Sequence, residues 1–160
     1  MKVYKAPENW PQQQYKKDKI PTIFLAGSIE MGKAENWQEK ITENLKDFNV
    51  VLLNPRRDDW DSSWKQSIED EKFSEQVNWE LDSLENCEVI VMYFDPNTKS
   101  PISLLELGLF ARSGKLAVIC PEGFWRKGNV DITCEKYKVT SFKTIDDFIN
   151  KMKSWLKTRE

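Results

Sequence analysis

The stretch EVIVMYFDPNTKSPISLLELGLF, residues 88–110, decides the fold. Its first part, Glu88–Phe94, is a short apolar run of the kind that forms a buried β-strand. Ser100 and Pro101 then suit the N-cap and the first residue of a helix, and the apolar residues after them predict a helix over 101–113. A continuous apolar strand that leads into a helix indicates a parallel sheet covered on both faces.

The same alternation extends over the rest of the chain and predicts an α/β fold with a mostly parallel sheet of about five strands. We expect a single domain over residues 1–160, in which residues 1–19 form a polar N-terminal arm that could hold a short strand. Such sheets bind ligands beyond the carboxyl ends of their strands. The other strands are expected at 20–26, 49–53, 115–120 and, as the fifth, 136–140; helices at 33–48, 68–87 (one helix, or two with a kink) and 144–157; and a loop at 121–131.

The composition excludes several classes of chemistry. The chain has no histidine, which excludes Ser-His-Asp and Cys-His catalysis. Its three cysteines are widely spaced, so a zinc site is not expected. The net charge is −2 with mixed signs, so no nucleic-acid polymer is expected as a partner. Without a membrane span or a signal peptide in the sequence, we expect a cytoplasmic protein. Acid–base chemistry falls to carboxylates, Tyr, Lys or Cys.

Glu106 is the leading candidate for that chemistry. It is the only charged residue between Pro101 and Ala111, and helical geometry groups it with Ser103 on a narrow polar stripe. Its side chain should point back toward the helix start, where ligands of a parallel sheet bind. An ionised carboxylate there would serve as a nucleophile. An exposed glutamate on an apolar helix explains the pattern equally well.

Two further motifs supply weaker candidates. The loop Gly27-Ser28-Ile29-Glu30-Met31-Gly32 follows the first of these apolar strands and could cradle a phosphate or a sugar, although a plain tight turn explains it too. The acidic set Glu80, Asp82 and Glu85 precedes the strand at 88–94, and one of these groups near Glu106 would complete a two-carboxylate site. Their spacing alone does not select which, and a solvated helix face is the simpler interpretation.

Aromatic and strand-end residues complete the set of candidates. Tryptophan can stack on a nucleobase, although for most of these rings packing in the core or at an interface is the better interpretation. Asn54 and Arg56 follow the strand at 49–53 and could line a pocket or form a turn. The aromatic candidates are Trp60, Trp64, Trp79, Phe124 and Trp125.

Taken together, FLAGSIE at 24–30, the acidic helix and SPISLLELG at 100–108 resemble the nucleoside 2-deoxyribosyltransferase family, including the related 2′-deoxynucleoside 5′-monophosphate N-hydrolases. The resemblance covers roughly residues 20–120. It implies a flavodoxin-like three-layer fold, a role in nucleotide salvage and no cofactor or metal. It also implies a covalent deoxyribosyl intermediate on Glu106, with Glu80, eight residues before Glu88, contacting and protonating the base, and Asp82 as the fallback.

The resemblance leaves the substrate open between nucleoside and 5′-monophosphate. Ser100 stands where the transferases usually have an aspartate and where the hydrolases have a phosphate-binding serine, whereas Glu30 replaces an arginine of the hydrolases. We expect Gly27, Ser28, Ser100, Ser103, Asp82, Asn54, Trp79 and Asn129 to contact the substrate. The family often builds its sites from two subunits, so a homodimer or larger homo-oligomer is expected. The loop at 121–131 would then reach across with Phe124, Trp125, Arg126 and Asn129.

Three other functions fit parts of the pattern. A non-catalytic nucleotide-binding module would use the same loops, and a hydrolase of another N-glycoside, such as a nicotinamide dinucleotide, would use the same glutamate. A response-regulator-like receiver would place Asp95 as an acidic site residue, but no acidic pair follows the apolar strand at 20–26, so this function ranks last.

Overall fold

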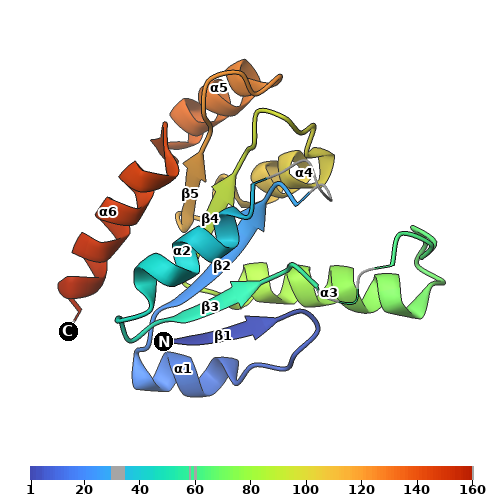
Figure 1. Ribbon diagram of the computed structural model, residues 1–160, viewed down its shortest axis with the longest axis horizontal. Helices are drawn as coiled ribbons and strands as arrows, with labels where there is room; N and C mark the ends of the chain where they lie inside the picture. Colours follow the sequence, from blue (N-terminus) through green and yellow to red (C-terminus); the bar gives the residue numbers. More distant parts are fainter. Residues whose placement is uncertain (30–34, 58, 60, 160) are drawn as a thin grey trace.

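A parallel sheet in the order β1-β3-β2-β4-β5-β6 forms the centre of the protein (Figure 1). The computed structural model describes residues 1–29, 35–57, 59 and 61–159. All of the pairings between neighbouring strands in this part of the chain are parallel. The six strands are β1 (Lys2–Lys5), β2 (Thr22–Gly27), β3 (Val51–Asn54), β4 (Val89–Tyr93), β5 (Leu116–Ile119) and β6 (Thr140–Phe142).

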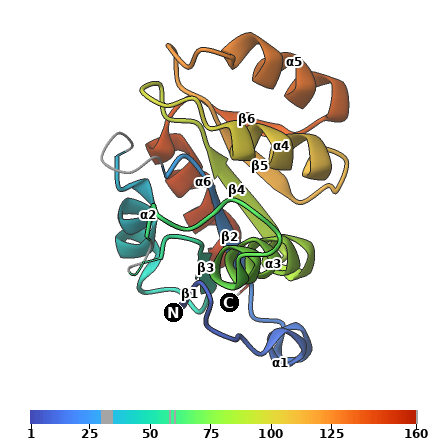
Figure 2. The same ribbon diagram turned by 90° about the vertical axis from the view of Figure 1, so that its right-hand side faces the viewer.

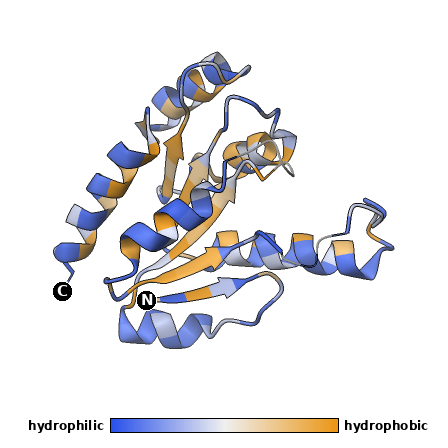
Figure 3. Ribbon diagram, in the orientation of Figure 1, coloured by the Kyte–Doolittle hydropathy of each residue, from blue (hydrophilic) through white to orange (hydrophobic). Residues whose placement is uncertain are grey.

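Helices cover both faces of the sheet and give three layers (Figure 2). On one face, α2 (Trp37–Leu45) and α6 (Ile145–Lys157) enclose one buried cluster. On the other, α3 (Glu71–Asn86), α4 (Pro101–Phe110) and α5 (Lys127–Tyr137) enclose a second, and Tyr15 of α1 (Gln12–Asp18) packs against it. The central strands are apolar, and α4 is apolar over most of its length (Figure 3). The predicted α/β class and covered parallel sheet are therefore confirmed.

The strand order creates the crevice in which such folds bind ligands. β3 lies on one side of β2 and β4 on the other, so the chain reverses direction across the sheet beside β2. Crevices at such a switch point lie outside the carboxyl ends of the strands. Gly27 ends β2 there with φ of 127°, and a Cβ at this residue would lie 2.2 Å from the Tyr93 carbonyl oxygen. Only glycine permits this close approach of β2 to β4.

The structure corrects three details of the sequence-based prediction and decides between the alternatives for a fourth. The sheet has six strands in the described residues rather than about five, because residues 2–5 of the N-terminal arm pair with β3. The segment 68–87 is one helix, α3, which begins where the Asp70 carboxylate accepts a hydrogen bond from the Phe73 N–H at 3.0 Å.

The other two corrections fall on the segment 121–140. The predicted loop at 121–131 overlaps α5, in which Val130 and Cys134, one turn apart, are buried in the core. The strand predicted at 136–140 lies at 140–142 instead, because the helix continues to Tyr137 and ends at Lys138 with φ of 55°. Among the described residues, no helix is both long and apolar enough to cross a membrane.

Candidate active site

A cavity of about 500 Å³ lies at the carboxyl end of β2, between α3 and α4. We call it the α3–α4 pocket. Its volume falls in the range of small-molecule sites, which are mostly apolar with a few placed polar groups. The walls include the apolar residues Phe24, Phe73, Val77, Leu105 and Leu109, and the polar residues Gln76, Glu80, Ser100, Ser103 and Glu106.

Glu106 lies in the second turn of α4 and is 8% exposed. No hydrogen bond to its carboxylate occurs in the part of the chain that the structure describes. Burial, and secondly the negative charge of Glu80, raise the pKa of Glu106 to about 8. The structure therefore rules out the alternative that Glu106 is a solvent-exposed residue on an apolar helix.

Glu80 reaches the same pocket from α3. Its Oε1 accepts a hydrogen bond from Gln76 Nε2 at 2.7 Å. Burial raises the pKa of Glu80 to about 7, while the Gln76 hydrogen bond acts in the opposite direction. The two interacting carboxylates therefore titrate as a pair that shares one proton near neutral pH.

Of the two carboxyls, Glu106 has the higher pKa, because the effect of burial is not offset at Glu106 by a hydrogen bond, as it is at Glu80 by Gln76. The sequence predicts an ionised Glu106, and the raised pKa of its carboxyl differs from that expectation. The physical reason is the burial of Glu106 in a largely apolar wall, which penalises its charged form.

Three hydroxyl groups fix the start of α4 beside the pocket. The oxygen atoms are 2.9 Å apart for Ser28 and Thr98, 2.6 Å for Ser28 and Ser100, and 2.7 Å for Thr98 and Ser100. Ser28 also accepts a hydrogen bond from the Asp95 N–H at 2.9 Å and is 1% exposed. Ser100 occupies the N-cap position in a left-handed conformation, with φ of 47°, and its side chain makes no capping hydrogen bond.

The structure brings together one part of the predicted site. Gly27, Ser100 and Ser103 line the α3–α4 pocket with Glu80 and Glu106, whereas Ser28 lies beneath it. Asp82 and Asn129 are exposed on α3 and α5 and do not line it. Glu30 and Trp60 lie outside the described residues.

The other candidates have structural contacts. The Asn54 Oδ1 accepts a hydrogen bond from the Arg56 N–H at 2.9 Å, as in a turn. The Trp79 Nε1 donates to the Glu8 carbonyl at 2.9 Å, and its ring packs 6.1 Å from that of Phe24. The Phe124 ring packs 4.9 Å from that of Phe94, and the Trp125 Nε1 donates to the Lys99 carbonyl. Trp64 stacks with the Arg57 guanidinium 4.9 Å from its ring.

Sequence analysis missed most of the α3 wall, namely Phe73, Gln76 and Val77. Gln76 had a usable signal, because it precedes Glu80 by one turn on the helix predicted at 68–87. Its contact with the Pro55 carbonyl joins segments 21 residues apart and has no counterpart in the sequence pattern.

Fold and pocket together define an α/β protein with a paired-carboxylate pocket at the switch point of its sheet. The family model "Nucleoside 2-deoxyribosyltransferase like" matches residues 20–124, and the chain belongs to this family, which is typically enzymatic. Comparison with curated protein sequences gives no significant match. The fold is similar to the crystal structure of a conserved protein from Enterococcus faecalis V583, with a TM-score of 0.60 and 15% sequence identity, over 86% of this chain and 99% of that one.

Proposed function

We propose that this protein cleaves the N-glycosidic bond of a 2′-deoxynucleoside and transfers the deoxyribosyl group to another base or to water. Glu106 acts as the nucleophile and Glu80 as the acid that protonates the leaving base. The observation that carries this proposal is a pair of carboxylates from two helices, Glu106 buried and Glu80 half-buried, in one largely apolar pocket. Two carboxylates that share a proton are the groups that glycosidic cleavage requires.

The chemistry proceeds in two displacements. First, a Glu106 oxygen forms a bond to C1′ while the C1′–N bond breaks; the electron pair leaves with the base, which takes the proton of Glu80. A second base or a water molecule then attacks C1′, its proton passes to Glu80, and the electron pair of the ester bond returns to Glu106. Two inversions give net retention at C1′. The carboxylate stabilises the positive charge that develops at C1′ in each step.

Substrate binding would move the shared proton into its working position. A ring nitrogen of the base that accepts a hydrogen bond from Glu80 favours the proton on Glu80. Glu106 is then ionised next to C1′. The displacement thus starts from the singly protonated pair without any further proton exchange with water.

The charge of the pocket supports a nucleoside rather than a 5′-monophosphate. No Lys or Arg is present among its described lining residues, while two carboxylates are. A phosphate in this pocket would be repelled by them. The 5′-monophosphate N-hydrolase therefore stays the second candidate, favoured only by Ser100 in the wall.

We also propose that a second copy of this chain covers α4. Three apolar residues share one face of α4 and are largely exposed. They are Ile102, Leu105 and Leu109, with exposed fractions of 60%, 60% and 57%. All three line the mouth of the α3–α4 pocket, so a partner on this face would close it. An apolar helix surface of this kind is typical of an interface.

Light scattering tests the homodimer. We expect the wild type to have twice the mass of one chain and Leu105→Glu to have the mass of one chain. Ile132→Glu is the control, since Ile132 is 68% exposed on α5, away from the pocket. A wild type that is monomeric at all concentrations would overturn this part of the proposal.

A chromatographic assay tests the activity. Deoxyadenosine, deoxyinosine, deoxycytidine, thymidine and their monophosphates are incubated with the protein, with and without an added free base. We expect base release or exchange with the wild type and a loss of at least about a thousandfold in Glu106→Gln. Tight binding without any product would instead favour a nucleotide-binding module, and full rate in the variant would exclude Glu106 as the nucleophile.

A further inference from the structure

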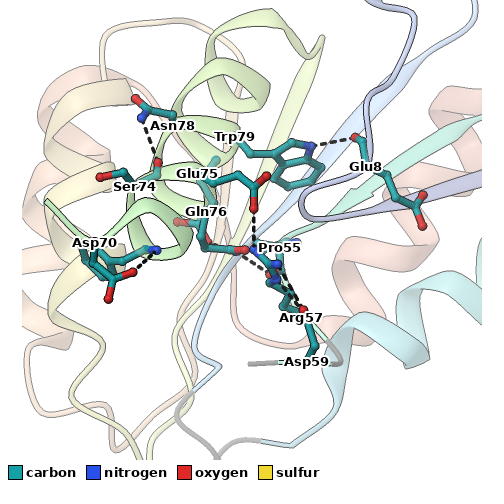
Figure 4. A network of polar contacts seen from close by, with 12 residues as sticks. Glu8, Pro55, Arg57, Asp59, Asp70, Ser74, Glu75, Gln76, Asn78 and Trp79 are labelled. Atoms are coloured by element: carbon teal, nitrogen blue, oxygen red, sulfur yellow. Dashed lines mark hydrogen bonds and ion pairs between the residues drawn. The ribbon is translucent and has the colours of Figure 1, made fainter. Parts of the chain in front are cut away.

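Gln76 holds an unsatisfied hydrogen-bond acceptor in the wall of the α3–α4 pocket. The residue is 4% exposed and lines the pocket. Its Nε2 donates to the Pro55 carbonyl at 2.9 Å (Figure 4). It also donates to Glu80 Oε1 at 2.7 Å, so both N–H groups are used. Its Oε1 is buried and has no hydrogen-bond partner among the residues that the structure describes.

The orientation of this amide is fixed by its surroundings. The Pro55 carbonyl oxygen can only accept a hydrogen bond, so the amide nitrogen must face it. Exchanging the nitrogen and oxygen would place Oε1 against that carbonyl and against the Glu80 carboxylate. The acceptor therefore remains the unpaired atom.

An unpaired buried acceptor is costly and rare in folded proteins. The two hydrogen bonds that Nε2 donates explain an amide at Gln76, but they leave its Oε1 without a role in folding. A ligand that brings an N–H group to this atom would satisfy it.

Glu80 supplies the complementary group beside it. Its Oε1 is engaged by Gln76, which leaves Oε2 to carry a proton and donate it. The α3 wall thus offers one acceptor, Gln76 Oε1, next to one donor, protonated Glu80. A nucleobase that pairs with both groups needs an edge with an N–H donor next to a ring nitrogen that accepts a hydrogen bond. Adenine and cytosine have such an edge at their exocyclic amino group, whereas hypoxanthine, thymine and uracil place a carbonyl oxygen there.

We propose that Gln76 and Glu80 together recognise the amino-substituted edge of the nucleobase, so that the pocket selects adenine and cytosine over bases with a carbonyl group at that edge, such as hypoxanthine, thymine and uracil. This inference rests on the proposed function, in which Glu80 protonates the leaving base. The ring nitrogen that accepts this proton belongs to the edge that Gln76 and Glu80 recognise. An oxo base would face Gln76 with a second acceptor and leave the buried Oε1 unpaired.

Two measurements test the selection separately from catalysis. Base release is measured for deoxyadenosine and deoxycytidine against deoxyinosine and thymidine. Calorimetry measures the binding of free adenine and cytosine against hypoxanthine and uracil. In both, we expect the wild type to favour the amino bases by about 10- to 100-fold.

The variant Gln76→Met removes the acceptor, together with the two hydrogen bonds that Nε2 donates, with little change in length. We expect it to bind the two classes within about threefold of each other. Gln38→Met is the matched control, because the Gln38 amide is also buried without a partner but does not line the pocket. It should keep the wild-type preference. Circular dichroism establishes that both variants are folded, and the wild-type comparison needs no variant.

The outcomes distinguish this inference from the proposed function. Base release without preference for amino bases, or a preference that survives in Gln76→Met, overturns the inference alone. A binding preference that depends on Gln76, without any base release, supports the inference as a binding specificity and counts against the proposed catalysis. Equal binding of both classes by the wild type overturns the inference whatever the activity.

Discussion

At the residue scale, burial of the Glu106 carboxylate costs free energy of folding, and packing does not explain why this residue is there. Its carboxylate is buried among apolar side chains of α4 and near the negative charge of Glu80. A leucine there would extend the apolar wall. Strongly perturbed carboxylates in a pocket are more typical of a functional site than of a structural one, and their removal commonly stabilises the fold.

This cost predicts a specific dependence of stability on pH. Because the pKa of Glu106 rises from 4.5 unfolded to about 8 folded, the folded state binds more protons over this range. The contribution of Glu106 to stability is complete below pH 4.5 and is lost as the pH rises through about 8. We expect Glu106→Gln to match the wild type at pH 4.5 and to exceed its free energy of unfolding at pH 9 by a few kcal/mol, on the order of one per pKa unit.

Denaturant titrations at both pH values measure this difference. Glu135→Gln, on the exposed side of α5, serves as the control and should follow the wild type. A Glu106→Gln variant that is less stable than the wild type at pH 9 would mean that the charge is stabilised rather than penalised in the pocket.

Glu80→Gln tests the coupling of the two carboxylates. The variant removes a negative charge, so the pKa of Glu106, measured from the pH dependence of unfolding, should fall. The acidic limb of the pH–rate profile should stay near its wild-type position, because Glu80 is already neutral on that limb. The alkaline limb, which reports loss of the Glu80 proton, should disappear. Loss of the acid should lower the rate by about 100- to 10,000-fold. An unchanged pKa of Glu106 in Glu80→Gln would show that the two groups do not interact.

At the scale of elements, the contact between the ends of β2 and β4 shapes one wall of the pocket. Gly27→Ala would place a Cβ 2.2 Å from the Tyr93 carbonyl oxygen in a conformation, φ of 127°, that alanine rarely adopts. We expect a loss of at least about 2 kcal/mol in the free energy of unfolding. Thermal denaturation measures it, and Gly128→Ala is the control because a Cβ there has open space. Equal stability of the two variants would contradict this account of the glycine.

A second element, the segment between β3 and α3, is held to α3 by Arg57. Its guanidinium contacts Asp59 at 2.7 Å and Glu75 at 3.3 Å (Figure 4). Because Asp59 and Glu75 are largely exposed, Arg57→Met should cost no more than about 1 kcal/mol of stability. It should nevertheless raise hydrogen exchange in residues 61–70. Arg112→Met is the matched control, since Arg112 contacts Tyr137 on the far side of α4. Unchanged exchange would contradict the role of Arg57.

At the scale of the whole molecule, the periodicity of the sequence predicts most of the sheet. The apolar runs at 20–26, 49–53, 88–94 and 115–120 correspond to β2, β3, β4 and β5, because strands covered on both faces are apolar throughout. β1 is different: KVYK is mixed and only four residues long, since an edge strand needs few apolar residues, and its pairing with β3 is a long-range contact.

The pocket could be predicted only in part. Glu106 and Glu80 were recognisable because each sits at a family-like position on a helix. Two further properties of the pocket depend on burial and on contacts between α3, α4 and the Pro55 carbonyl. They are the unpaired Oε1 of Gln76 and the higher pKa of Glu106 relative to Glu80. Such properties belong to the assembled fold and have no local sequence signal.

The central claim is that Glu106 forms a covalent bond to the deoxyribosyl group. Rapid acid quenching of the protein during turnover of deoxyadenosine or deoxycytidine, followed by mass spectrometry of proteolytic peptides, measures it directly. We predict a mass increase of one deoxyribosyl group on the peptide that contains Glu106 and none on the same peptide of Glu106→Gln. Turnover of either substrate by a wild type whose deoxyribosyl group is found on a different residue would contradict the account.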